Sequence, residues 1–73
     1  MARKMRYWIS VLRRAGAYEE KGSGSSHRKW AHPDIPTKLR IAYHKEGVDA
    51  KPYQENDIRE FLAAIEEAKR KHK

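Results

Sequence analysis

An apolar stripe near each end of the chain is the feature that most restricts its fold. Apolar side chains recur at intervals of three and four residues from Lys4 to Ala15 and again from Asp57 to Lys69, which gives each segment the single apolar face of an amphipathic helix. The stripes comprise Met5, Trp8, Ile9, Leu12 and Ala15, and then Ile58, Phe61, Leu62, Ile65 and Ala68. A chain of 73 residues has room for only one core. We therefore predict a single domain over residues 1–73, in which both helices bury their stripes together.

The ends of these two helices carry recognisable signals. Gly16 follows the first stripe, and glycine accepts the left-handed conformation that often ends a helix. Asn56 precedes the second stripe and is a plausible N-cap, so we predict that the last helix begins at Asp57. The residues after it, 69–73, form a basic tail that we expect to fray.

The segment between the helices favours three strands, at residues 17–21, 26–32 and 37–43. The "PDIP" sequence at 33–36 indicates a turn between the last two. In the third strand Leu39 and Ile41 alternate with Lys38 and Arg40, the period of a half-buried strand. We predict an α+β fold of order α-β-β-β-α, with both helices on one face of a three-stranded antiparallel sheet. The other face is then open to solvent.

The charge balance favours a polyanionic partner. The chain has 17 Lys and Arg against 10 Asp and Glu, a net charge of +7, and nucleic acid is the commonest partner of a small basic domain. There is no cysteine, which excludes disulfides, thiolate metal sites and a cysteine nucleophile. No apolar run approaches the roughly 20 residues that span a bilayer, so we expect no membrane association.

Strand alternation predicts which residues lie on the open face. Trp30 is the large apolar residue of the second strand and should face the helices, which directs His27 and Lys29 to the open side with Lys38 and Arg40. This places an imidazole among cations that can bind phosphate. A solvated polar face with an ordinary surface histidine is the alternative.

Two other groups of side chains carry weaker signals. His44, Glu46 and Asp49 lack the spacing of a metal site, so we predict no metal and no cofactor. Serines precede His27, but no carboxylate lies nearby in sequence to orient a serine–histidine pair. Serine is also common in turns.

The chain resembles the HicA-type toxins, which are small mRNA interferases with a double-stranded-RNA-binding-like fold. The resemblance runs from about Met5 to Ala68 and is sharpest in Gly24-Ser25-Ser26-His27, where the family carries a Gly-Ser-x-His or Gly-Ser-His element. An aromatic residue at Trp30, the "HP" at residues 32–33 and a histidine just after the third strand, His44, also fit. The glycine- and serine-rich stretch then corresponds to a hairpin turn before the second strand.

The resemblance implies a metal-independent endoribonuclease that acts on mRNA in the cytoplasm and is neutralised by a HicB-type antitoxin. It also implies that His27 is the catalytic residue. The residues that we expect to contact RNA are Ser25, Arg28, Lys29, Lys38, Arg40 and His44. Two alternatives stay open: a non-catalytic RNA-binding module of the same fold, and an adaptor whose basic face binds only an acidic protein. RNA affinity that falls steeply with salt would separate both RNA-binding functions from the adaptor.

Overall fold

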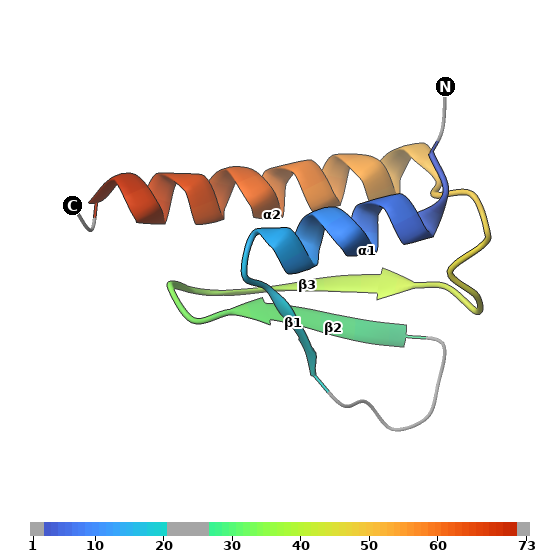
Figure 1. Ribbon diagram of the computed structural model, residues 1–73, viewed down its shortest axis with the longest axis horizontal. Helices are drawn as coiled ribbons and strands as arrows, with labels where there is room; N and C mark the ends of the chain where they lie inside the picture. Colours follow the sequence, from blue (N-terminus) through green and yellow to red (C-terminus); the bar gives the residue numbers. More distant parts are fainter. Residues whose placement is uncertain (1–2, 21–26, 72–73) are drawn as a thin grey trace.

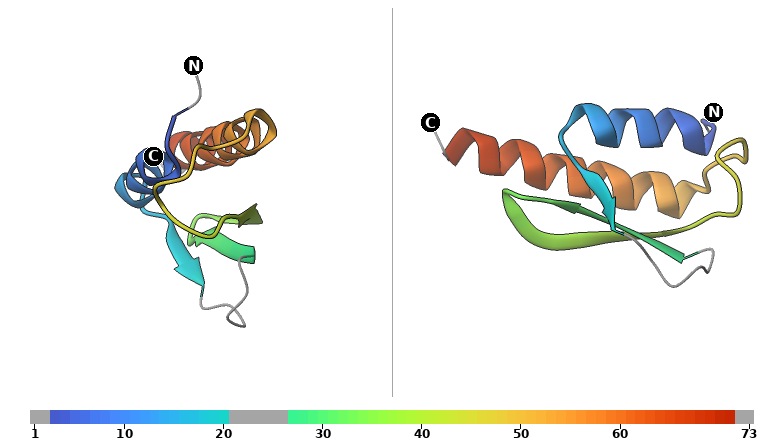
Figure 2. Two further views of the ribbon diagram at one scale, coloured as in Figure 1. Left: turned by 90° about the vertical axis from the view of Figure 1, so that its right-hand side faces the viewer. Right: turned by 60° about the horizontal axis from the view of Figure 1, so that its bottom comes forward.

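The elements follow the order α-β-β-β-α, as predicted. The computed structural model describes residues 3–20 and 27–71. The elements are α1 (Met5–Arg14), β1 (Tyr18–Glu20), β2 (His27–His32), β3 (Ile35–Ala42) and α2 (Pro52–Lys71) (Figure 1). The strands form an antiparallel sheet in the order β1-β2-β3. Both helices cover the same side of this sheet, and its other side stays open (Figure 2).

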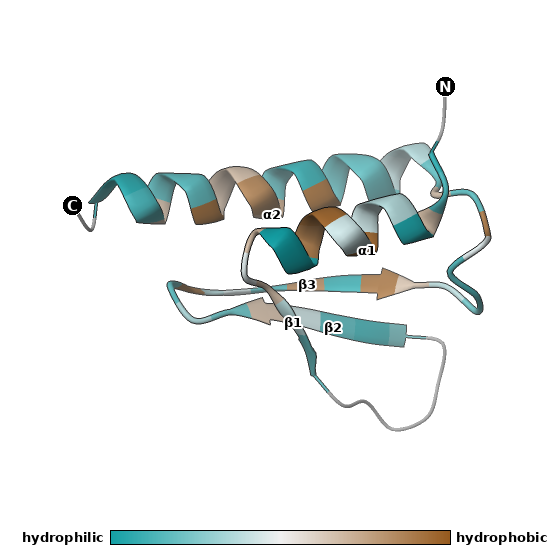
Figure 3. Ribbon diagram, viewed as in Figure 1, coloured by the Kyte–Doolittle hydropathy of each residue, from teal (hydrophilic) through white to brown (hydrophobic). Residues whose placement is uncertain are grey.

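The core lies between the helices and the sheet. Trp30 of β2 is 0% exposed and belongs to a cluster with Leu12 of α1, Ile41 of β3 and Phe61 of α2. Leu62 packs against this cluster but is only partly buried. Coloured by hydropathy, α1, α2 and β3 carry apolar segments, while the first half of β2 is hydrophilic (Figure 3). The predicted burial of both helical stripes against one face of the sheet is therefore confirmed.

The two ends of α1 are stabilised in different ways. At its start no side chain caps the helix; instead, the N–H groups of Met5 and Arg6 donate to the carbonyls of Val48 and Glu46, at 2.7 and 2.8 Å. The connection before α2 thus satisfies donors that a helix start leaves unpaired. At the other end Gly16 has φ +94°, and the N–H groups of residues 16 and 17 donate to Arg13 and Leu12. This is a Schellman motif, and it confirms Gly16 as the helix stop.

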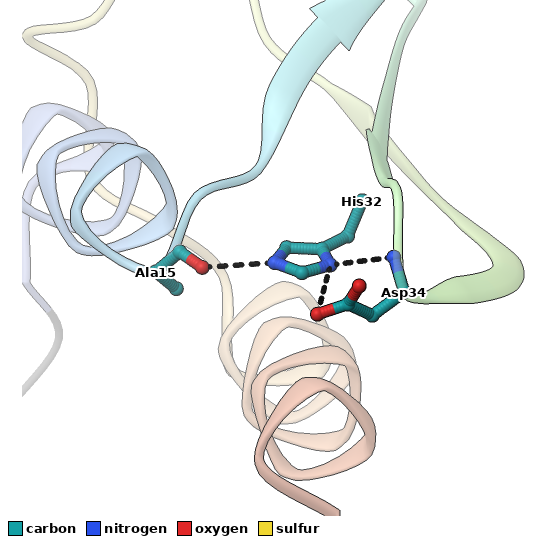
Figure 4. A network of polar contacts seen from close by, with 3 residues as sticks. All are labelled: Ala15, His32 and Asp34. Carbon is teal, nitrogen blue, oxygen red and sulfur yellow. Dashed lines mark hydrogen bonds and ion pairs between the residues drawn. The ribbon is translucent and has the colours of Figure 1, made fainter. Parts of the chain in front are cut away.

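His32 joins the end of α1 to the turn after β2 (Figure 4). The N–H of Asp34 donates to Nδ1 at 3.0 Å, so Nδ1 is an acceptor and Nε2 carries the proton. Nε2–H therefore donates to the Ala15 carbonyl at 3.0 Å. The ring also lies close to Gly16, where an added Cβ would come within 3.1 Å of Nε2. Glycine is thus favoured at this point by its backbone conformation, and an added Cβ would also press against the His32 ring.

The prediction that α2 begins at Asp57 with Asn56 as its N-cap is wrong. The helix begins at Pro52, and Asn56 lies inside it, where its Nδ2 donates to Glu60. Proline suits the first helical turn because it has no N–H to leave unpaired. Two positions later, the Gln54 side chain accepts a hydrogen bond from the Lys51 N–H at 2.9 Å, as in a capping box. The helix also continues to Lys71, so the predicted basic tail is helical as far as the structure describes it.

The strand boundaries differ slightly from those predicted. The turn after β2 is confined to Pro33 and Asp34, and β3 begins at Ile35 rather than at residue 37. The pairing register shifts between Trp30 and His32, which is typical of a β-bulge. Strict alternation from Trp30 would put Ala31 on the open face with His27 and Lys29, but Ala31 is buried in this irregular part of β2.

A buried carboxylate holds the N-terminal segment, α1 and α2 together. Glu55, at 8% exposure, accepts hydrogen bonds at Oε2 from the backbone N–H of Arg3 at 3.0 Å and from the indole N–H of Trp8 at 3.1 Å. Its donors are 52 and 47 residues away along the chain. These bonds favour the ionised form and lower the pKa of Glu55 below its ordinary value of 4.5.

We predict that Glu55→Gln destabilises the protein at neutral pH but not in acid. A lowered pKa in the folded state adds stability above the unfolded value, and this stability is lost as the pH falls through the folded pKa. Thermal melts of the wild type and the variant should therefore differ at pH 7 and converge well below pH 4.5. Glu67→Gln, at an exposed position on α2, is the matched control. A gap between wild type and Glu55→Gln that persists unchanged in acid would contradict this role.

Candidate functional site

The sheet separates an apolar face from a basic one. In β2 Trp30 is buried while His27 and Lys29 are exposed. In β3 Leu39 and Ile41 are buried while Lys38 and Arg40 are exposed. The assignment of these side chains to the two faces is therefore confirmed. We call His27, Lys29, Lys38 and Arg40 the basic face.

The strand register brings most of the basic face into one place. Lys29 lies directly opposite Arg40, and His27 lies opposite Ala42. His27, Arg28, Lys29 and Arg40 line a depression of about 280 Å³. The imidazole and two cations, chosen from the sequence by strand alternation, thus share one hollow on the open side of the sheet.

Arg28 lines the same depression, but its guanidinium already has protein partners. Its Cα pairs with that of buried Ile41, so its side chain leaves the strand on the other face. Nη1 donates to Glu19 Oε2 at 3.0 Å, and Cζ lies 4.6 Å from the centre of the Tyr43 ring. The hydrogen bond to Glu19 raises the pKa of Arg28 above its ordinary value. Arg28 is thus placed to fix the first part of β2 against its neighbours.

Lys38 also has a partner that the sequence analysis did not find. Its Nζ donates to both carboxylate oxygens of Glu20, at 2.9 and 2.8 Å. Glu19 and Glu20, the two acidic residues of β1, thus contact one cation each on opposite faces of the sheet. The acidic pair was visible in the sequence, but its partners depend on the strand order and register.

Comparison with known protein families identifies a family to which most of the chain is similar. The family described as the HicA toxin of bacterial toxin-antitoxin systems matches residues 6–69, most of the chain. The chain belongs to the HicA toxin family. Proteins of this family are generally RNA-cleaving toxins, and such a toxin is paired with an antitoxin. No curated protein and no solved structure matches the chain.

Another predicted site residue of this HicA chain, His44, lies beyond the end of β3. It is exposed in the connection after this strand, two positions beyond Ala42, the residue paired with His27. It does not line the depression. Ser25 and the rest of the glycine- and serine-rich stretch lie outside the described residues.

The acidic residues near His44 do not form a metal site in the described part of the chain. Asp49, considered above with His44 and Glu46, pairs with Lys4 at 3.0 Å. Over residues 3–20 and 27–71, no three His, Cys, Asp or Glu side chains gather to hold a metal ion. No helix in those two ranges is long and apolar enough to cross a membrane.

The opposite faces of β2 predict opposite responses to substitution. His27→Ala should change the free energy of unfolding by no more than about 0.5 kcal/mol, because the side chain is exposed. Trp30→Ala should lower it by about 3–5 kcal/mol, because the indole fills the core. Denaturant titrations of the two variants and the wild type measure both effects. Comparable losses in the two variants would contradict the face assignment.

Proposed function

We propose that this HicA toxin is a metal-independent endoribonuclease that cleaves mRNA, with His27 as its general acid–base. The observation that carries the proposal is the depression that His27 shares with Lys29 and Arg40. Phosphoryl transfer needs a group that moves a proton and fixed positive charge near the phosphoryl oxygens. The depression supplies both on a surface that an RNA backbone can reach.

The reaction that suits this site is attack by the ribose 2′-hydroxyl on the adjacent phosphate. His27 takes the proton of the 2′-hydroxyl as the bond from O2′ to phosphorus forms. Lys29 and Arg40 stabilise the negative charge on the non-bridging oxygens. The bond from phosphorus to O5′ then breaks, and the departing oxygen takes a proton. His44 is our candidate for that proton donor, because it follows the strand that lies beside His27.

The antitoxin in this proposal is a HicB-type protein that covers the basic face. A surface with this charge is best matched by acidic side chains. Covering it would keep RNA away from His27, which accounts for neutralisation without any change in the toxin. Toxin, antitoxin and mRNA would then meet in the cytoplasm.

We predict that His27→Ala strongly slows cleavage while sparing the fold and most RNA affinity. Loss of a general acid–base group should slow cleavage by about 10²–10⁴, whereas the cations that bind phosphate remain. The test is RNA cleavage by wild type and variant with a chelator present, alongside a thermal melt and a binding titration. A folded variant that cuts near the wild-type rate would show that His27 is not catalytic. RNA binding without cleavage by the wild type would favour the non-catalytic module instead.

We predict that charge reversal of Lys29 and Arg40 together weakens RNA binding and flattens its dependence on salt. Each lost phosphate contact should reduce the slope of log affinity against log salt by about one. Lys69 and Arg70 are exposed in the last turn of α2, and their reversal is the matched control for net charge. Affinities that fall equally in the two double variants would mean that the basic face is not the RNA site.

A further inference from the structure

The carboxylate of Glu20 lies among the cations that we assign to RNA. The pairing register places Glu20 of β1 beside Lys29 of β2, and Lys29 beside Arg40 of β3. The three residues therefore form one row across the sheet, and side chains in such a row project from the same face. Glu20 is the acidic end of a row whose other members line the depression.

Glu20 also pairs with a residue beyond the middle strand. Both of its carboxylate oxygens accept hydrogen bonds from Nζ of Lys38, which lies on β3. The two side chains together thus cross β2 on the open side of the sheet. Glu20 presents two negatively charged oxygens to this lysine, as a phosphate group of RNA would.

We propose that Glu20 competes with the RNA backbone for Lys38 and so limits the affinity of the basic face. This inference rests on the proposed function, because it takes RNA phosphate as the competing ligand. In the free protein the ammonium is held by the carboxylate. When RNA binds, a phosphate replaces the carboxylate, and Glu20 turns to solvent.

The exposure of the pair makes such an exchange feasible. The side chains of Lys38 and Glu20 are 50% and 31% exposed, and ion pairs at exposed positions are weak. A phosphate that is already bound at Lys29 and Arg40 can therefore displace the carboxylate from Lys38. The ion pair between Arg28 and Glu19 differs, because Arg28 is also stacked on Tyr43.

The experiment compares Glu20→Gln and Lys38→Gln, singly and together, in a His27→Ala parent that does not cut the probe. The probe is a labelled single-stranded RNA of mixed sequence, titrated at several salt concentrations. Glu67→Gln, exposed on α2, makes the same change in net charge away from the sheet and is the matched control. Thermal melts verify that each variant is folded.

We expect Glu20→Gln to tighten RNA binding by about two- to fivefold at low salt, the range that corresponds to an exposed ion pair. In the parent, the displaced Glu20 carboxylate takes up a cation from solution, which partly offsets the counterions that RNA releases. Glu20→Gln removes this uptake, so RNA affinity should fall more steeply with salt in the variant than in the parent. Glu20→Gln should have little effect when Lys38 is already Gln, and Glu67→Gln should have less effect than Glu20→Gln.

Three results would overturn the inference, and they are distinguishable. A parent that binds RNA, with Glu20→Gln no tighter than Glu67→Gln, would show that Glu20 does not compete and would leave the proposed function intact. Equal tightening by Glu20→Gln with and without Lys38 would show that Glu20 does not act through Lys38, and would also leave the proposed function intact. No RNA binding by the wild type, the parent or any variant would overturn both the proposed function and this inference.

Discussion

Burial of the Trp30 indole determines which way the side chains in the first part of β2 point. The ring is completely enclosed between the helices and the sheet, in the same cluster as Leu12 and Phe61. Side chains alternate along a strand, so this single position directs His27 and Lys29 to the opposite side. The candidate site thus depends on the core through the geometry of one strand.

The sheet is less positive than the composition of β2 and β3 implies. Glu19 and Glu20 each contact a cation, and they do so from the short strand β1. A chain with net charge +7 attracts any polyanion at long range. Acidic groups placed among the cations weaken such non-selective attraction and leave specificity to ligands that can displace them. The exposed contact of Lys38 and the stacked contact of Arg28 therefore have different consequences for the binding that we propose.

Features set by local periodicity could be predicted from the sequence, and features set by distant partners could not. The helical stripes, the Gly16 stop and the alternation in β3 each depend on residues only a few positions apart. The true start of α2 also had a local signal, Pro52 followed by Gln54, but Asn56 was a competing candidate for the cap. The bond from Trp8 to Glu55 spans 47 residues, and that from Lys38 to Glu20 needs the strand order. Neither follows from spacing along the chain.

The contact between His32 and Gly16 restricts how this protein can vary in evolution. A side chain at position 16 would meet the imidazole within 3.1 Å and would also have to adopt φ +94°. Exchanging His32 for a smaller residue would open the space, but it would leave the Ala15 carbonyl and the Asp34 N–H without their present partner. A change at either position therefore has a cost at the other. We expect the two positions to vary together rather than singly.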